Sequence, residues 1–265
     1  CKKVDLQMGG KFTYYRSYKR MKMQNTASRP EIFDNFVPDA SESTSQNHKT
    51  MKIKAEFIIL ASTKVGDRSL VLHTLSPEWG RRSFLVGATR QNLAMALPLN
   101  IVEAEISVSR VSELWRANAL ECTQSLNSIR SDMTRGAISM FMAEVLYRTV
   151  RDGAVESGLY EWCRSSIRLL DSMESSYANF HLRWLLEFAA VLGFTPDAEA
   201  LRPFAGELSG QIESLLDCSW AEAMLVPLNG ELRNSMAKRL ISYISYHCCC
   251  EINIRSLDVL HEIFI

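Results

Sequence analysis

The spacing of apolar residues changes once along this chain, close to residue 130, and this change limits the folds that the chain can adopt. Residues 101–108 alternate apolar and polar positions, which is typical of a strand with one buried face. Residues 138–146 instead place apolar side chains three and four positions apart, which is typical of a helix with one buried stripe. The sequence therefore predicts a β-rich part followed by an all-helical part.

Short apolar runs precede the change, and turns that contain glycine or proline separate the first three of them. Residues 65–67 and 76–80 are turns of this kind. Short strands packed into about 70 residues, with no helical period between most of them, favour a small closed barrel such as the OB-fold. The strands are expected at residues 55–60, 69–75, 81–87, 101–108 and 114–121.

Capping residues mark the boundaries of the helices that follow. Ser131 or Asp132 suits the N-cap of the first long helix. Gly193, followed by Pro196, suits the end of another helix. Residues 198–230 are less regular. Further helices are expected at residues 156–173, 180–192, 231–250 and 256–264.

Residues 1–50 differ from the rest of the chain, because their basic and aromatic residues follow no period. Residues 40–48 form a polar tract that cannot bury a core. We expect residues 1–50 to be disordered or a non-native N-terminal extension, with a basic nucleic-acid-binding arm as the alternative. The predicted organisation is this extension, an OB-fold barrel at residues 51–122 and an all-α helical domain at residues 123–265, which makes a two-domain α+β fold.

The formal net charge of the whole chain is zero, but the charge is distributed unevenly. Residues 1–50 carry +4, residues 51–130 carry +3 and residues 131–265 carry −7. Such an asymmetry favours different partners for the two halves. A basic barrel suits nucleic acid, whereas an acidic helical domain suits contacts with other proteins.

The cysteines and the hydropathy pattern bear on the compartment. The chain has seven cysteines, an odd number with no regular spacing, which argues against a disulfide framework and favours reduced thiols in a cytoplasmic protein. No apolar run approaches the roughly 20 residues of a membrane span. The N-terminal residues also lack the apolar segment of a secretory signal. We therefore expect a cytoplasmic protein without membrane partners.

The common catalytic motifs are absent from the sequence, so we predict no enzyme activity, no catalytic residues and no cofactor. Glu103 and Glu105 share a strand face and could hold a nuclease metal, but a solvated face is the simpler interpretation. His181 is interpreted as a local hydrogen-bonding residue on its helix. Residues 243–250, with three adjacent cysteines, suggest a metal site, but successive helix residues point about 100° apart, so packing is favoured.

Five stretches of this sequence, taken together, resemble the RecO family. None is specific alone, but agreement in order and spacing across residues 51–265 compounds. They are the glycine-acidic-x-serine turn at residues 65–71, with Val65 where tyrosine is common, the glycine-basic strand and its glycine-alanine-x-basic tail at residues 80–90, the first long helix at residues 141–146, the helix ending in glycine-phenylalanine-x-proline at residues 185–196, and the C-terminal segment at residues 254–260.

This resemblance implies a DNA repair and homologous recombination mediator of the RecF pathway. Such a protein binds single- and double-stranded DNA, binds the C-terminal tail of single-stranded DNA-binding protein (SSB), acts with RecR to help load RecA, and promotes annealing. Many members also carry a four-cysteine zinc site after the glycine-phenylalanine-x-proline stop. Residues 197–230 of this chain hold only Cys218, and a tetrahedral site needs four ligands, so we predict no metal.

Basic positions of the barrel are the candidate DNA contacts, because Lys and Arg pair with phosphates and release condensed counterions. Arg81, Arg82 and Arg90 are the strongest candidates, and an ordinary solvated surface is the alternative. Trp79 and Trp115 could stack on unpaired bases, although packing in the core is the more common role. The full set of candidate DNA-binding residues is Lys52, Lys54, Lys64, Arg68, Arg81, Arg82 and Arg90.

The acidic tail of SSB would need a local basic pocket on the helical domain. Arg135, Arg148 and Arg151 are the candidate partner-binding residues, and the last two lie close together on a helix surface because they are three apart. Isolated surface arginines are the alternative. Two other functions stay open: a generic OB-fold RNA-binding or adaptor protein without a repair role, and a metal-dependent nuclease.

Overall fold

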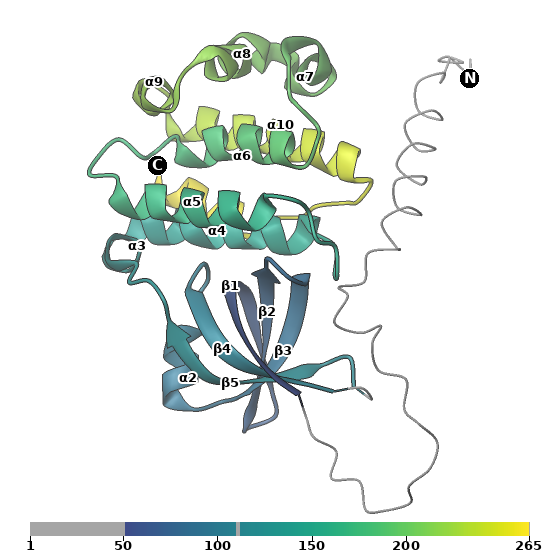
Figure 1. Ribbon diagram of the computed structural model, residues 1–265. Helices are drawn as coiled ribbons and strands as arrows, with labels where there is room; N and C mark the ends of the chain where they lie inside the picture. Colours follow the sequence, from purple (N-terminus) through teal and green to yellow (C-terminus); the bar gives the residue numbers. More distant parts are fainter. Residues whose placement is uncertain (1–50, 110–111, 265) are drawn as a thin grey trace, which may run out of the picture. The chain divides into compact units, whose positions relative to one another are not determined.

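The computed structural model describes residues 51–109 and 112–264 (Figure 1). The expectation for residues 1–50 concerns a segment outside these described residues. The described strands and helices belong to one compact unit that spans Lys49–Ile265. The strands are β1 (Met51–Val65), β2 (Ser69–Ser76), β3 (Gly80–Gly87), β4 (Ile101–Val108) and β5 (Trp115–Cys122).

The strands close into a barrel in the order β1-β2-β3-β5-β4. Neighbouring strands run antiparallel except for β3 and β5, which run parallel with Phe84 opposite Trp115. Closure removes the strand edges that would otherwise pair with other chains. A five-stranded barrel followed by helices confirms the predicted fold class. The domain boundary between residues 122 and 123 falls at the end of β5 and stays a prediction.

Two features of the barrel differ from the sequence-based expectation. Strand β1 runs from Met51 to Val65 and is much longer than the predicted run. Its two ends are mostly exposed and mixed in polarity, so the apolar pattern reveals only the middle. A short helix, α2 (Arg90–Met95), was also not predicted. Thr89 caps this helix by accepting a hydrogen bond from the Asn92 N–H at 3.1 Å.

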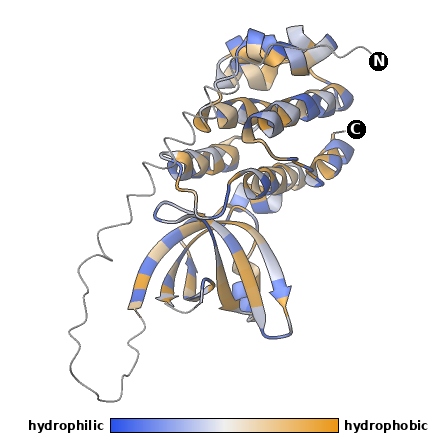
Figure 2. Ribbon diagram, turned by 90° about the vertical axis from the view of Figure 1, so that its right-hand side faces the viewer, coloured by the Kyte–Doolittle hydropathy of each residue, from blue (hydrophilic) through white to orange (hydrophobic). Residues whose placement is uncertain are grey.

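Strand β1 is buried on both faces at residues 57–60. Phe57 and Ile59 point into the core inside the barrel, whereas Ile58 and Leu60 belong to the core formed by the helices. Successive strand side chains point to opposite faces, so one strand serves two cores. Figure 2 shows hydrophobic and hydrophilic residues interleaved along both the barrel strands and the helices.

Helices stack above the barrel, with α4 and α5 in the layer next to it, then α6 and α10, then α7 to α9 (Figure 1). The boundaries are α3 (Asn127–Ser131), α4 (Met133–Thr149), α5 (Leu159–Ser172), α6 (Phe180–Val191), α7 (Ala198–Ala205), the 3₁₀ turn η2 (Gly206–Leu208), α8 (Ser209–Asp217), α9 (Trp220–Leu225), α10 (Gly230–Cys248) and α11 (Ser256–Ile263).

Both predicted caps are confirmed. Asp132 is the N-cap of α4, and its carboxylate accepts a hydrogen bond from the Arg135 N–H at 2.8 Å. Gly193 has a positive φ of 86°. Its N–H donates to the Ala190 carbonyl, and the next N–H donates to the Ala189 carbonyl, so carbonyls at the end of α6 are satisfied.

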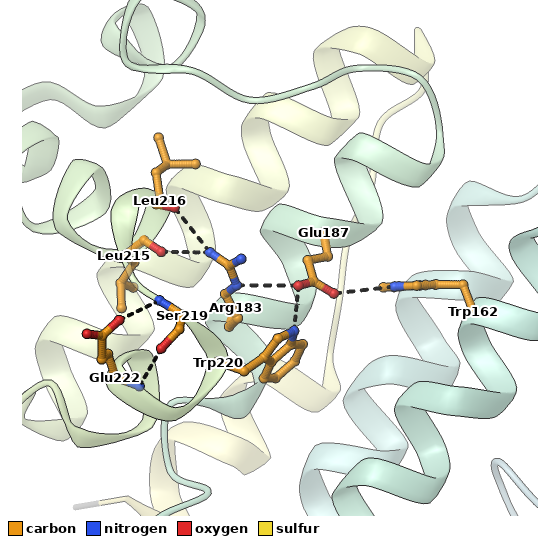
Figure 3. A network of polar contacts seen from close by, with 8 residues as sticks. All are labelled: Trp162, Arg183, Glu187, Leu215, Leu216, Ser219, Trp220 and Glu222. Atoms are coloured by element: carbon orange, nitrogen blue, oxygen red, sulfur yellow. Dashed lines mark hydrogen bonds and ion pairs between the residues drawn. The ribbon is translucent and has the colours of Figure 1, made fainter.

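The segment with the weakest sequence pattern folds into α7, η2, α8 and α9, and polar contacts attach it to the rest of the helices (Figure 3). Glu187 on α6 accepts hydrogen bonds from the indole N–H groups of Trp162 and Trp220. Arg183, one turn earlier, lies 3.5 Å from Glu187 and donates to the carbonyl of Leu215 at 2.9 Å. These contacts join α5, α6, α8 and α9.

The donor set of this segment does not fit the four-cysteine zinc site that the resemblance to the RecO family brings into question. Cys218 is the single cysteine between residues 197 and 230, and zinc in such a site needs four ligands. Within residues 51–109 and 112–264, no three His, Cys, Asp or Glu side chains are grouped to hold a metal ion. Hydrogen bonds and an ion pair around Glu187 attach this segment to the other helices.

Gly80 permits a close approach between the barrel and the helical part. It has a φ of +61°, and a Cβ atom at this position would lie 1.9 Å from the carbonyl oxygen of Ala154. Next to it, the Arg81 carbonyl accepts a hydrogen bond from the Gly153 N–H at 2.8 Å. Only glycine satisfies both the backbone angle and the space.

The first prediction compares Gly80→Ala with Gly66→Ala. Both glycines have a φ of +61°, but a Cβ at Gly66 would meet no atom within 4 Å. We expect Gly66→Ala to lower the free energy of unfolding by about 1 kcal/mol, since only the left-handed backbone is penalised. Gly80→Ala should cost about 3 kcal/mol, because a clash is added. Urea unfolding measures both, and equal losses would contradict the close approach.

The second prediction concerns the network around Glu187. Glu187→Gln removes the charge that faces Arg183, and we expect the free energy of unfolding to fall by about 2 kcal/mol because the arginine is mostly buried. Glu174→Gln, at an exposed position, is the control and should change it by less than about 0.5 kcal/mol. Urea unfolding followed by tryptophan fluorescence measures both, because Trp162 and Trp220 contact Glu187.

Candidate nucleic-acid interface

The outward side of strands β2 and β3 is the part of an OB-fold that binds oligonucleotides. Inward residues of these strands, such as Leu72 and Phe84, fill the barrel. The alternate residues therefore face outward. We call them, with the neighbouring residue of β1, the β2–β3 outer face. It consists of Thr63, Val71, His73, Ser83 and Leu85.

Polar side chains cross this outer face in a row. The Thr63 hydroxyl lies 3.2 Å from His73 Nε2, and the Ser83 hydroxyl lies 2.9 Å from His73 Nδ1. Burial, and then the nearby charge of Arg81, lower the pKa of His73 below its usual range. His73 is therefore neutral at neutral pH, and the row offers hydrogen-bonding groups rather than positive charge. No motif in the sequence marks these three side chains as a site.

Three of the predicted DNA-binding residues gather at one end of this face. Lys64 is the next-to-last residue of β1, Arg68 lies in the β1–β2 turn, and Arg90 begins α2. The Ala88 N–H donates to the Arg68 carbonyl at 2.9 Å, which joins the turn to the segment before α2. All three side chains are exposed, and none has an ion-pair partner among the described residues. We call Lys64, Arg68 and Arg90 the turn cluster.

Arg116 is a further exposed cation that the sequence analysis did not single out. It lies on β5 directly opposite Leu85 of the β2–β3 outer face. The predicted strand at residues 114–121 included it, but only the parallel pairing of β3 with β5 places it beside this face. Pairing between strands far apart in sequence leaves no local signal.

Lys52 and Lys54 lie on β1 but face a different neighbour. Lys52 Nζ is 2.6 Å from Glu105, and Lys54 Nζ is 3.1 Å from Glu103. The hydrogen bond and charge of Glu103 raise the pKa of Lys54. These lysines balance the two glutamates that a nuclease metal would need, so this side of the barrel is a solvated surface of mixed charge.

Arg81 does not face solvent. Its guanidinium is 2.7 Å from Asp152, donates to the Tyr147 carbonyl and lies over the Tyr147 ring at 4.8 Å. Its side chain is 17% exposed. The hydrogen bond from Arg81 holds the pKa of Asp152 below its usual range. Arg81 thus attaches the barrel to the helical part, and its charge is balanced by a carboxylate.

Arg82 also makes its contacts inside the chain. Its guanidinium carbon lies 3.5 Å from the centre of the Trp115 ring, and Nη2 donates to the Glu113 carbonyl at 3.2 Å. Burial lowers its pKa. Trp79 packs edge-on against Trp115 and Phe84. The two tryptophans therefore pack on the barrel core, which is the alternative that the sequence analysis gave for them.

The three candidate partner-binding arginines are separated by the fold. Arg135 is buried, donates to the Met173 carbonyl and lies 4.4 Å from the Tyr177 ring. It therefore joins α4 to the segment after α5. Arg148 and Arg151 are exposed at the C-terminal end of α4 and just beyond it.

The remaining candidate groups are structural. His181 is fully buried between the rings of Phe141 and Phe264, and burial lowers its pKa to about 3. Burial raises the pKa of Cys248 to about 12 and also raises that of Cys250, which makes both thiols poor nucleophiles. None of the described helices is long and apolar enough to cross a membrane.

Residues 130–200 match the family described as "Recombination protein O C terminal". A DNA repair protein RecO from Phocaeicola vulgatus is 28% identical over 233 residues, which cover 78% of this chain and 97% of that protein. A DNA repair protein RecO from Flavobacterium psychrophilum is 26% identical over 238 residues, which cover 81% of this chain and all of that protein. One from Porphyromonas gingivalis is 30% identical over 156 residues, or 56% of this chain and 64% of that protein.

The fold defines a class of protein in which an OB-type barrel precedes a helical part and shares a core with it. The matches extend over both parts and nearly the full length of several relatives. The chain is therefore similar to RecO proteins along most of its length, as the sequence motifs indicated.

The third prediction tests the role of Arg81. Arg81→Met should lower the free energy of unfolding by about 2 kcal/mol, because it removes charged hydrogen bonds to Asp152 and Tyr147. Asp152 has a folded pKa below its unfolded value. Its contribution is therefore present above the unfolded pKa of about 3.9 and is lost as pH falls through the folded value.

Urea unfolding at neutral pH and in acid measures this effect. The loss caused by Arg81→Met should shrink in acid, because the wild-type protein then also lacks the ion pair. Arg90→Met, at an exposed position, is the control and should change stability by less than about 0.5 kcal/mol. A loss that is equally large at both pH values would contradict an ion-pair role.

Proposed function

We propose that this protein is a DNA repair and homologous recombination mediator that binds DNA through its barrel. The relatives that match it along most of its length are named DNA repair proteins RecO. The observation that supports DNA binding best is the turn cluster of Lys64, Arg68 and Arg90, which stands exposed beside the β2–β3 outer face.

The proposed binding needs no base-specific contacts. Phosphates that pair with the turn cluster release condensed counterions, and this gain does not depend on sequence. Hydrogen-bonding groups of the outer face, such as His73 and Ser83, lie where an OB-fold holds its ligand. A cationic surface also screens the repulsion between two backbones, which supports annealing of complementary strands. We propose binding of both single- and double-stranded DNA.

The partners proposed for this chain follow from the family. They are the C-terminal tail of SSB, RecR and, indirectly, RecA, in the RecF pathway. The charge of −7 on residues 131–265 favours protein contacts over general DNA contacts for much of the helical part. We propose no catalytic turnover, and the proposed place of action is the bacterial cytoplasm at the nucleoid.

The structure changes the set of residues that we propose to contact DNA. Lys64, Arg68 and Arg90 stay in it, and Arg116 joins them. Lys52 and Lys54 are paired with glutamates, whereas Arg81 and Arg82 make internal contacts. We therefore propose that the last four contribute little to phosphate binding.

The fourth prediction tests the turn cluster. A triple variant, Lys64→Gln, Arg68→Gln and Arg90→Gln, should bind single-stranded DNA more weakly. Its plot of log affinity against log salt should be flatter by about 2, because each phosphate contact on a single strand contributes about 0.7 to the slope. Fluorescence anisotropy with a labelled oligonucleotide, repeated over a series of salt concentrations, measures both.

The control removes the same charge elsewhere. Arg202→Gln, Lys238→Gln and Arg239→Gln change three exposed residues of α7 and α10, and DNA binding should stay close to that of the wild type. An unchanged salt slope in the turn-cluster variant would contradict the proposed site. Preference for RNA over DNA of the same sequence would favour the adaptor alternative, and cleavage in the presence of magnesium or manganese would favour the nuclease.

A further inference from the structure

The C-terminal end of α4 lies against the β2–β3 outer face. The ring of Tyr147, at the end of α4, is 5.0 Å from the ring of His73 on β2. The same tyrosine ring contacts the guanidinium of Arg81 on β3 at 4.8 Å. The face that an OB-fold offers to its ligand therefore does not end at the barrel but meets a helix end.

Two exposed arginines stand directly after this contact. Arg148 follows Tyr147 and lies 3.9 Å from Glu144, at the limit of an ion pair. Arg151 donates one hydrogen bond, at 3.4 Å, to the Cys248 carbonyl. A guanidinium has five N–H donors, so each contact uses a small part of its capacity. An ion pair of this length is weak, so Arg148, whose side chain is 46% exposed, can exchange it for a phosphate.

The carboxylates beside these arginines are already engaged. Asp152 forms its ion pair with Arg81. Glu144 accepts hydrogen bonds from the backbone N–H and the hydroxyl of Ser256, at 2.8 and 2.6 Å. The charge of Asp152 is therefore balanced by Arg81, and Ser256 holds the Glu144 carboxylate through two hydrogen bonds, although the helical part as a whole is acidic.

We propose that Arg148 and Arg151 bind phosphates of the same nucleic-acid strand that lies on the β2–β3 outer face. The strand would run from the turn cluster, along β2 and past His73 and Tyr147, to the end of α4. This inference rests on the proposed function and adds a second cationic contact on the helical part. The two arginines then belong to the DNA interface and not to a pocket for the tail of SSB.

The dimensions of the structure agree with such a path. His73 lies four positions after Ser69, where β2 begins beside the turn cluster, and four steps along a strand span about 13 Å. Tyr147 extends the path beyond His73 onto α4. A strand bound along it falls within the roughly 4–16 nucleotides that an OB-fold contacts.

The neighbouring cavity does not itself offer a site to an acidic peptide. A cavity of about 360 Å³ opens between the β2–β3 turn and the start of α5. Glu156 and Glu161 line it, and their carboxylates would repel the carboxylates of an acidic tail. DNA that follows the outer face has no need to enter this cavity.

The fifth prediction uses charge reversal in the full chain. A double variant, Arg148→Glu and Arg151→Glu, should bind an oligo(dT) of about 16 nucleotides roughly tenfold more weakly than the wild type. Its salt slope should be flatter by about 1.4, which corresponds to two lost phosphate contacts on a single strand. Arg148→Glu alone keeps the bond between Arg151 and the Cys248 carbonyl, and should give about half of the change in slope. Circular dichroism melting of both variants checks that they fold.

The matched control is Arg202→Glu with Arg239→Glu, which reverses two exposed charges on α7 and α10. This control should bind the oligonucleotide like the wild type. The same proteins are then titrated with a peptide that carries the acidic C-terminal tail of SSB, and the Arg148 and Arg151 variants should bind it like the wild type.

Each contrary outcome has its own meaning. Unchanged DNA binding with loss of peptide binding would assign the two arginines to the protein partner and overturn this inference alone. Equal weakening in the control would show a general charge effect and would also overturn it. A wild-type chain that binds no DNA at all would overturn the proposed function together with the inference.

Discussion

The structure depends on one strand that is buried on both of its faces. Phe57 and Ile59 of β1 fill the barrel, while Ile58 and Leu60 enter the core between the helices. A shift of one residue in the pairing of β1 would exchange these two sets. The register of β1 therefore fixes the barrel and its attachment to the helices at the same time, which explains why residues 49–265 form a single compact unit.

The same attachment divides the arginines and lysines of the barrel into two kinds. Arg81 lies next to Gly80, at a point of close approach, so its charge is used to hold Asp152 and the Tyr147 carbonyl. Lys64 and Arg68 lie at and just beyond the other end of β1, where both side chains are exposed. Burial costs an unpaired charge several kcal/mol, so a barrel cation that is buried at this attachment, such as Arg81, is paired with a carboxylate.

The outer helices are also attached through a partly buried charged group that is hydrogen-bonded to side chains of other elements. Glu187 gathers two indole N–H groups and Arg183, and so joins α8 and α9 to α5 and α6. A metal would hold such a segment through four strong ligands, whereas this network uses hydrogen bonds to one carboxylate. Its weakness, compared with a metal site, is that loss of a single side chain leaves buried donors without partners.

The sequence alone determined the kinds of elements, because alternation and helical spacing are local properties. It gave the five strands, the cap at Asp132 and the stop at Gly193, but not the ends of β1, helix α2 or the helices of residues 198–230, where the apolar pattern is weak. The tertiary structure alone decided which cations are available. Arg81 and Arg68 look alike in the sequence, and only the folded chain places a carboxylate beside one and solvent beside the other. Contacts between distant residues, such as Arg116 with β3 or Tyr147 with His73, arise from strand pairing and helix packing that no short stretch encodes.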